Sequence, residues 1–406
     1  MLILVILVIL VASIWAGLLL AYRIPLQRLW REPALAVPVL IVESDDWGPG
    51  PPAHAAALGR IVDILARHRD ATGRAAVMTI GAILAIPDNE AIRRNGLRWH
   101  DSRTLLAPDF DAIRKALIQG QELGVLALQL HGMTHYWPPT FLKAMADDKL
   151  VRDWILTSDG VETETLPSPI QSRWTDTSVL PSQPLSVETI RAAVAEEVSR
   201  FQDCFGVRPT VAVPPTFVWN RDVEQAWVEH GIQVIVTPGR RLTLRDAEGR
   251  PGGCDRTMLN AERGASGAIY LVRDIYFEPA LGHRVEPTLA EIARHVRLGR
   301  PALIETHRVN FTGTQEQRER SLAELDRLLS RARERWPDMR FLSSAELAER
   351  LAQRDPSMVE QRLSLRLSIW IGRAAAIDRL RKLAWITGLA IPAWLFQVAR
   401  RFSGKT

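Results

Sequence analysis

Short apolar runs rich in β-branched residues alternate with longer stretches of helical periodicity between residues 38 and 351. This alternation predicts parallel strands joined by right-handed helical crossovers, either as an α/β barrel or as a doubly wound sheet. In both architectures, binding sites lie at the carboxyl ends of the strands. Strands are expected at 39–43, 76–80, 125–130, 210–214, 233–237, 269–272, 302–306 and 339–342, and helices at 56–69, 109–123, 187–205, 221–229, 288–298 and 315–334.

The first 22 residues contain no charged side chain and are almost entirely apolar. As a helix they would extend roughly 33 Å, enough to cross a bilayer core of about 30 Å. A cleaved signal peptide is the alternative, but no basic residue precedes the apolar run. We therefore predict a transmembrane anchor at 1–22 and a linker at 23–37. Arg23, Arg28 and Arg31 follow the anchor, and the positive-inside rule then places the domain that follows on the cytoplasmic side.

Residues 352–406 form a separate basic region, since 362–405 holds nine lysines or arginines and one acid. Apolar residues share one helical face from 362 to 377, with Arg362, Arg366 and Arg373 on the next face. This pattern predicts helices associated with an anionic membrane surface and disfavours nucleic acid as a partner. The uncharged run 384–399 is short for a span and is expected to be a surface-lying hairpin. Alternatively, these helices pack on the barrel.

The segment 147–186 interrupts the α/β alternation, because it is rich in Trp, Ser, Thr and Pro and lacks long apolar runs. We interpret it as an insertion over the active-site face. Trp154 and Trp174 either stack on a sugar or pin a long loop.

Four polar segments sit at or just after predicted strand ends. They are Glu43 to Gly48 (ESDDWG), His131 to His135 (HGMTH), Val213 to Asn220 (VPPTFVWN) and Glu305 to Phe311 (ETHRVNF). Such ends meet at one edge of a parallel sheet, so these segments are expected to converge. Adjacent side chains on a strand point to opposite sides, so one aspartate of the Asp45-Asp46 pair can bind a metal while the other faces the substrate.

Asp46, His131 and His135 are the predicted metal ligands. The two histidines are four residues apart and would share one face if the chain turned helical after the strand. Two imidazoles and one carboxylate leave coordination positions open for water and substrate, as a hydrolytic metal site requires. Zn²⁺ suits this ligand set best, although Co²⁺, Ni²⁺ or Mn²⁺ could occupy the same site.

In these motifs the chain resembles the polysaccharide deacetylase superfamily, whose fold is a distorted (β/α) barrel. The segments ESDDWG, HGxxH, PxxxWN, RDxxFEP (Arg273 to Pro279) and THRVNF resemble, more narrowly, a branch associated with bacterial surface-polysaccharide biosynthesis. The resemblance covers residues 38–350 and implies that Asp45 is the catalytic base and His307 the general acid. It also implies that Asp46, His131 and His135 bind the metal.

The implied reaction is hydrolysis of an N-acetyl group, with Asp45 taking a proton from water and His307 protonating the leaving amine. The third motif of the superfamily usually carries an arginine that orients the base, but Val213 to Thr216 has none. Arg273 or Arg308 could replace it. Further substrate contacts are expected from an apolar groove and from polar neighbours: Trp47, Pro214, Pro215, Phe217 and Trp219, and Arg273, Asp274, Arg308 and Asn310.

The sequence thus predicts a metal-dependent N-deacetylase of a lipid-linked or membrane-proximal glycan, anchored in a bacterial inner membrane. A deformylase or another hydrolase on the same scaffold, such as a glycosidase, is an alternative. The third reading is a catalytically inactive glycan-binding subunit of a polysaccharide assembly complex. A pure scaffold has no need of two acids and three histidines at one rim.

Overall fold

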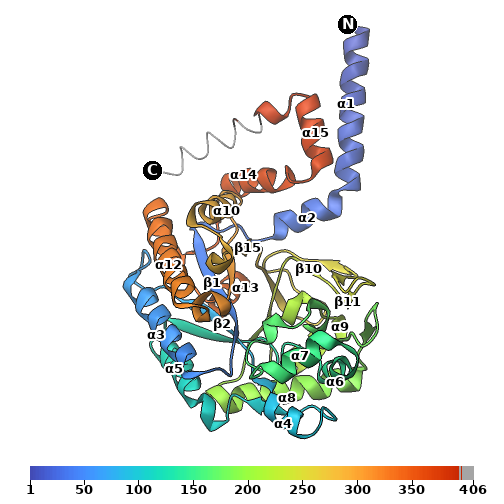
Figure 1. Cartoon of the computed structure of the whole chain (residues 1–406). Helices are drawn as coiled ribbons and strands as arrows, with labels where there is room; N and C mark the ends of the chain where they lie inside the picture. The colour runs from blue at the N-terminus through green and yellow to red at the C-terminus, as the bar shows by residue number, and fades with distance from the viewer. Residues whose placement is uncertain (393–394, 396–406) are drawn as a thin grey trace.

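A computed structural model describes residues 1–392 and residue 395 of the chain (Figure 1). Nine parallel strands form one curled sheet, in the order β14, β9, β8, β5, β2, β1, β16, β15, with β17 beside β1. Their bounds are β1 Val39–Trp47, β2 Met78–Ala82, β5 Leu126–Leu130, β8 Val211–Ala212, β9 Val234–Thr237, β14 Ile269–Val272, β15 Ile275–Tyr276, β16 Ala302–His307 and β17 Arg340–Phe341. All eight predicted strands are present, and β15 is the one strand of this sheet that the pattern missed. The pattern also missed four short two-stranded sheets outside it. The parallel α/β prediction is confirmed, as an open, barrel-like sheet.

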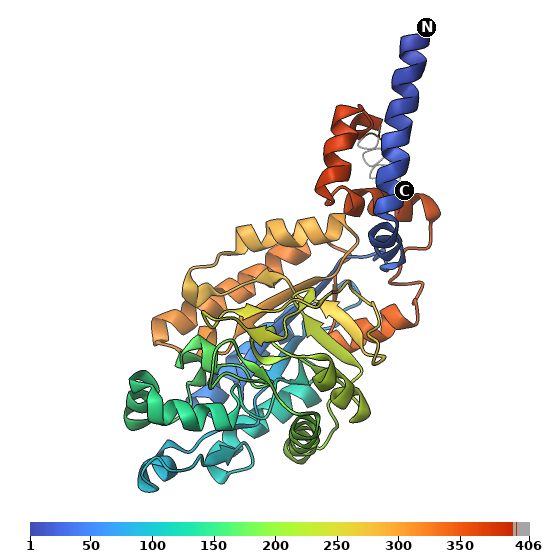
Figure 2. The same ribbon diagram turned by 90° about the vertical axis from the view of Figure 1, so that its right-hand side faces the viewer.

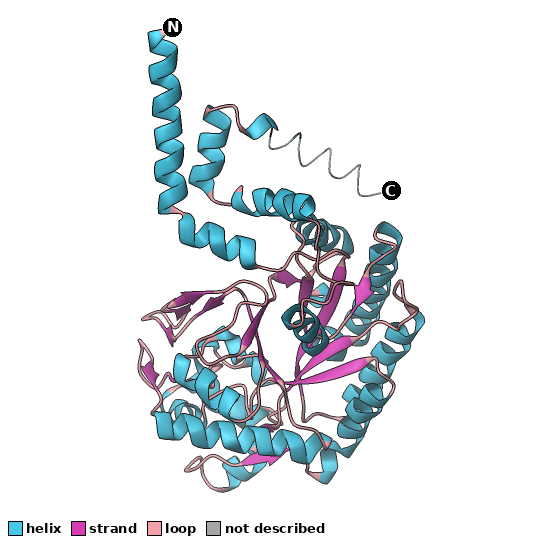
Figure 3. Ribbon diagram, turned by 180° about the vertical axis from the view of Figure 1, so that it is seen from behind, coloured by secondary structure: helices cyan, strands magenta, loops and turns pink. Residues whose placement is uncertain are grey.

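Helices pack around the outside of this sheet (Figure 3). Ser186 caps α8 by accepting a hydrogen bond from the Thr189 amide, and α8 ends at Gly206, whose φ is 72°. Thr314 and Gln317 form a capping box at the start of α12. The six predicted helices are all found: α3 Pro52–Arg67, α5 Asp111–Glu122, α8 Val187–Phe205, α9 Arg221–Glu229, α10 Val285–Arg297 and α12 Gln315–Arg335.

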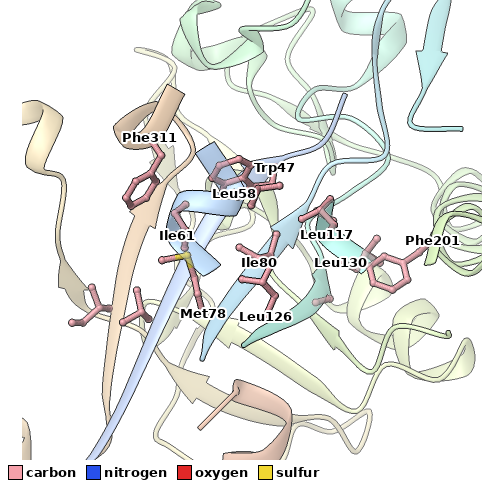
Figure 4. Packing of buried hydrophobic residues seen from close by; sticks show 14 of the residues in the cluster. Trp47, Leu58, Ile61, Met78, Ile80, Leu117, Leu126, Leu130, Phe201 and Phe311 are labelled. Atoms are coloured by element: carbon pink, nitrogen blue, oxygen red, sulfur yellow. The ribbon is translucent and has the colours of Figure 1, made fainter. Parts of the chain in front are cut away.

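Each strand divides its side chains between two environments. Met78, Ile80 and Ala82 of β2 face the helices in the larger core cluster, whereas Val39 and Ile41 of β1 belong to a second cluster on the other face of the sheet. Figure 4 shows the larger cluster. Burying one such aliphatic side chain stabilises the fold by about 1.5–3 kcal/mol, so the alternation fixes the register of each strand.

The amino-terminal helix α1 (Leu2–Ala21) leads into a second helix, α2 (Arg23–Arg31), where a linker was predicted. This helix is amphipathic and buries Leu26. That residues 23–37 act as a linker stays a prediction. Among the residues that the structure describes, no single helix is both long and apolar enough to cross a membrane. The pair Val5–Ala21 and Arg23–Arg31, bent by 65°, meets both criteria together. The membrane anchor stays a prediction.

The carboxyl-terminal helix α14 (Leu363–Ala374) packs on α2. The Trp370 Nε1 group donates to the Leu26 carbonyl over 2.9 Å, and the Trp370 ring meets Trp30 edge-on at 6.1 Å. Arg373, predicted to lie on a polar membrane-facing surface, is instead 2% exposed. This part of the protein therefore follows the alternative, in which the helix packs on the domain. The predicted hairpin at 384–399 extends beyond the described residues.

Candidate active site

A β-bulge at the end of β1 separates the two aspartates. Ser44 pairs with Ile80 and Trp47 with Ala82, so the two residues Asp45 and Asp46 lie opposite one residue of β2. Asp46 has a φ of 70°, a left-handed conformation that is costly for a non-glycine residue. The bulge directs the two carboxylates differently. A Cβ atom on the facing Gly81 would lie 2.3 Å from Asp45 Oδ1, so only glycine leaves room for this carboxylate.

The three predicted metal ligands converge. Asp46 Oδ1 lies 3.3 Å from His131 Nε2 and 3.5 Å from His135 Nε2. The three ligand atoms all lie within 4.8 Å of one another. His131 Nδ1 is 2.9 Å from the Val213 carbonyl, so this nitrogen carries the proton and Nε2 is free to bind a metal. Asp46 Oδ1 is buried and has no hydrogen-bond partner among the described residues. These features fit a divalent cation.

The two imidazoles reach the site from a loop, which corrects the expected helical turn. Gly132 has a φ of 102°, which no right-handed helix allows, and the two rings lie 5.2 Å apart. Burial lowers the pKa of His135 to about 4, so this ligand is neutral at physiological pH. Burial opposes the charge on His131, but Asp45 and Asp46 outweigh it and raise the pKa. A metal at His131 therefore competes with a proton for Nε2.

Arg273 contacts the predicted base, Asp45. Of the two arginines considered, Arg273 and Arg308, it is therefore the one placed to orient the base. Its Nη2 lies 2.5 Å from Asp45 Oδ2, its Nη1 lies 2.7 Å from Glu43 Oε2 and its Nε lies 3.1 Å from Glu305 Oε2. Burial would raise the pKa of Asp45, but Arg273 and then His131 lower it below its usual value. Asp45 Oδ1 is buried and lacks a protein partner in the described structure, so it can accept a proton.

His307 faces Asp45 across the β1–β16 pairing, where the two residues are in register. Its Nδ1 lies 2.6 Å from Glu278 Oε1, and Asn310 donates to the other oxygen of Glu278. Burial would lower the pKa of His307, but the hydrogen bond to Glu278 and the charge of Asp46 raise it to about 10. This histidine is thus protonated at neutral pH in the metal-free protein and can act as an acid.

These groups line one cavity of about 250 Å³. Every predicted catalytic and metal-binding residue lines it, and so do Arg273, Pro214 and Phe217. The insertion contributes Glu164 and Gln171. Thr216 and Phe217 have positive φ values of 54° and 55°, so the third motif reaches the cavity on a strained turn. The unpredicted lining residues are Glu164, Gln171, Thr216, Tyr276, Glu305 and Val309.

Phe217 reaches the cavity, but the predicted tryptophan contacts do not. Trp47 is fully buried and donates to Ser44 Oγ over 2.8 Å. Its ring lies near that of Phe311 (Figure 4). Trp219 is also fully buried, and Trp174 is 1% exposed and packs edge-on against Trp227. The core covers Trp47 and Trp219, so these two predicted sugar contacts are wrong. Trp174 follows the alternative in which it pins the long loop.

The remaining predicted contacts do not line the cavity. Arg308 is buried and binds both oxygens of Glu164 at 2.8 and 2.9 Å, so it positions a lining residue. Asn310 is buried and holds Glu278. Pro215 is buried against Gly132. Asp274 lies 3.1 Å from His295 Nε2. None of these four lines the cavity. Glu278 had no predicted role either, although it belongs to the RDxxFEP segment.

Comparison with known proteins returns deacetylase structures. The peptidoglycan deacetylase PdaC of Bacillus subtilis shares 12% identity at a TM-score of 0.38, covering 79% of this chain and 94% of its own. A family 4 acetyl xylan esterase from Clostridium thermocellum, in complex with cobalt, shares 12% identity at a TM-score of 0.36. The match covers 76% of this chain and 89% of the esterase chain. This chain is similar to polysaccharide deacetylases. At these identities, every residue role here rests on the geometry of the site itself.

One family model matches a different class. The model described as glycosyl hydrolase family 57 matches residues 163–308. The matched range includes Glu164, Arg273 and His307 but neither aspartate of β1 nor His131 and His135. No curated protein matches the sequence.

Proposed function

We propose that this protein is a metal-dependent hydrolase that removes an N-acetyl group from a sugar of a glycan. The observation that carries the proposal is a single cavity lined by three convergent ligand atoms, an ionised carboxylate with a free oxygen and a protonated histidine. Hydrolysis of an amide needs these parts: a site for an electrophile, a base for water and an acid for the leaving amine.

Asp46, His131 and His135 would hold the metal, and Zn²⁺ suits two imidazoles and one carboxylate. When bound, the cation would supply Lewis acidity toward the acetyl carbonyl. Asp45 takes the proton of the attacking water on its unpartnered Oδ1, while Arg273 holds Oδ2 at 2.5 Å. His307 gives its proton to the leaving amine. Glu278 keeps the His307 ring oriented and charged through the 2.6 Å contact at Nδ1.

The walls of the cavity suit an N-acetylated sugar. Pro214 and Phe217 provide an apolar surface for an acetyl methyl group or a sugar face. Glu164 and Gln171 provide polar atoms for hydroxyl groups, and Arg308 fixes the Glu164 carboxylate in place. We further propose that α1 anchors the enzyme in a bacterial inner membrane. Because Arg23, Arg28 and Arg31 follow α1, the catalytic domain would be cytoplasmic.

A glycoside hydrolase is the second candidate, and the family-model match over residues 163–308 favours it. Glu164 and Glu305 are the carboxylates of that range which line the cavity. A pair of carboxylates cleaves a glycosidic bond without a metal. Chelation therefore separates the two candidates, since it would leave a glycosidase active and stop a deacetylase.

The deciding experiment measures acetate release and reducing-end release from N-acetylated oligosaccharides by the purified full chain, before and after chelation. We expect acetate release that chelation abolishes and that added Zn²⁺ restores. His131→Ala should lack both metal and activity, whereas His230→Ala, outside the cavity, should retain both. Release of reducing ends that persists after chelation would refute the deacetylase proposal and support the glycosidase. A metal-loaded protein that releases neither product would overturn both.

A further inference from the structure

The helices at the two ends of the chain dock on the rim of the sheet where the strands begin. Arg373 of α14 donates to the carbonyls of Leu298 and Gly299, which precede β16, and to those of Glu32 and Pro33, which precede β1. The Leu35 amide in turn donates to the Gly299 carbonyl over 2.9 Å. We call this side the amino-terminal rim.

The catalytic cavity lies at the opposite rim. Asp45 and His307, which face each other in register, stand at the ends of β1 and β16. From Val39 to Asp46 the chain advances seven residues, or roughly 23 Å along the strand. Figures 1 and 2 show α1, α2, α14 and α15 (Asp378–Ile386) gathered at one end of the molecule, with α4 (Asn89–Arg94) at the other end.

Buried polar contacts dock α14 on the domain. The Arg373 guanidinium is fully engaged, with five backbone carbonyls as acceptors and Glu32 Oε2 at 3.3 Å. Trp370 adds its hydrogen bond to the Leu26 carbonyl, and a Cβ atom on Gly299 would lie 2.9 Å from Ile369. Buried, fully paired polar groups of this kind hold one arrangement, so α2 and the domain keep a fixed relative orientation.

The outer helices α1 and α15 present an uncovered apolar surface. In α15, Trp385 is 68% and Ile386 82% exposed, and most large side chains of α1 are exposed as well. The Trp15 Nε1 group donates to Thr387 Oγ1 over 3.3 Å, which ties the two helices together. Exposed Arg379 and Lys382 stand beside this apolar surface. Apolar side chains bordered by basic ones fit a bilayer with anionic headgroups.

We infer that α1, α2, α14 and α15 form a membrane mount that holds the catalytic cavity on the side of the domain facing away from the bilayer. The inference about the substrate rests on the proposed function and narrows it. Sugars far from the membrane along an extended glycan can reach a cavity at the far rim. A sugar attached directly to a membrane lipid cannot. The substrate is therefore an extended glycan and not a short, membrane-proximal saccharide.

The orientation can be tested without any activity. The full chain carrying Cys254→Ser is labelled with a donor dye through Arg98→Cys beside α4, or through Arg297→Cys at the end of α10. Each protein is reconstituted in phosphatidylcholine vesicles with phosphatidylglycerol and an acceptor lipid. We expect energy transfer from position 297 to exceed that from position 98 several-fold. Equal energy transfer from the two positions, or stronger transfer from position 98, would refute the proposed orientation of the domain.

The substrate preference is tested with lipid-anchored saccharides that carry either one or many N-acetylated sugars. In vesicles, acetate release from the long saccharide should exceed that from the short one by on the order of tenfold, because a tether that cannot span two sites gives almost no effective concentration. In detergent the two rates per sugar should become similar. Equal rates in vesicles would refute the preference. Absence of release in detergent as well would refute the proposed function, while the energy-transfer result would still decide the orientation.

Discussion

The two rims of the sheet use buried arginines in opposite ways. At the carboxyl-terminal rim, Arg273 is surrounded by three carboxylates, Glu43, Asp45 and Glu305, so this cluster holds more acid than base. At the amino-terminal rim, Arg373 is surrounded by backbone carbonyls and one acid, Glu32. The first arrangement leaves a carboxylate charged and positioned for chemistry. The second joins segments that are distant in the sequence.

The same contrast appears in the polar atoms that lack partners. At the catalytic rim, Asp45 Oδ1, Asp46 Oδ1 and His135 Nδ1 are buried without a hydrogen bond in the described structure. None of the guanidinium nitrogens of Arg373 is left in this state. Unpaired buried polar atoms reduce stability, and proteins retain them where a ligand or a substrate completes the pairing. The comparison therefore predicts which changes affect catalysis and which affect only the fold.

The largest effect is expected from Asp46→Ala. This change removes the only carboxylate of the ligand set, so bound metal should be lost and activity should fall by about a thousandfold or more. Metal analysis of the purified protein and acetate release check both consequences. The matched control is Asp274→Ala, since Asp274 does not line the cavity. If Asp274→Ala lost as much metal and activity as Asp46→Ala, the effect of Asp46→Ala would reflect reduced stability of the fold and not loss of a metal ligand.

Asp45→Asn should come next. The amide keeps the size of the side chain but cannot take a proton, so kcat should fall by roughly 10²–10⁴-fold while the metal remains bound. Metal content and kcat, measured on one preparation, provide the check. A variant that loses its metal in parallel with its activity would make Asp45 a ligand and not the base.

Most of the fold and the central part of the site could be predicted from the sequence because both follow local rules. Periodicity located all eight predicted strands, and the carboxyl ends of parallel strands had to bring Asp46, His131 and His307 together. The predicted Trp47 contact failed for a physical reason. Trp47 follows Asp46 directly, but the bulge at Asp46 turns the Trp47 side chain toward the helices. A bulge adds one residue to a strand, and no periodicity reports it.

Contacts between residues far apart in the sequence were the other feature that could not be predicted. Arg273 was one of two candidate arginines, and only the register of the sheet shows that it contacts Asp45 across 228 positions of the chain. The buried position of Arg373 was hidden as well, because helical periodicity groups it with Arg362 and Arg366. Its acceptors are backbone carbonyls, which every residue has, so no motif marks them.

Two single variants, Arg273→Met and Arg373→Met, test the comparison of the two rims directly. Both changes remove a buried charge from its partners and should each cost about 3–5 kcal/mol of unfolding free energy. Only Arg273→Met should also lower kcat of the folded fraction, by on the order of tenfold to a hundredfold, because Asp45 loses its orientation. Denaturant titration gives the stabilities, and kcat per folded molecule gives the catalytic effect. A similar kcat loss in Arg373→Met would mean that the two rims are coupled.

The smallest effect is expected from Glu278→Gln and concerns pH. The hydrogen bond to Glu278 is the foremost of the contacts that raise the pKa of His307 to about 10, and a bound divalent cation would lower that value. Activity needs His307 protonated, so it is lost as the pH rises through this pKa. Removing the Glu278 charge should move this alkaline limb to lower pH by about one unit or more, equivalent to about 1.4 kcal/mol.

The pH profile of kcat/KM measures this shift, and Tyr276→Phe serves as its control. Tyr276 also lines the cavity and titrates at alkaline pH, with its pKa raised by burial and by Glu305. If His307 is the acid, the alkaline limb of Tyr276→Phe should stay where it is in the unmodified protein. A limb that disappears in Tyr276→Phe and stays in place in Glu278→Gln would assign the proton to the tyrosine. The carboxyl-terminal rim would then hold its acid on β15 and not on β16.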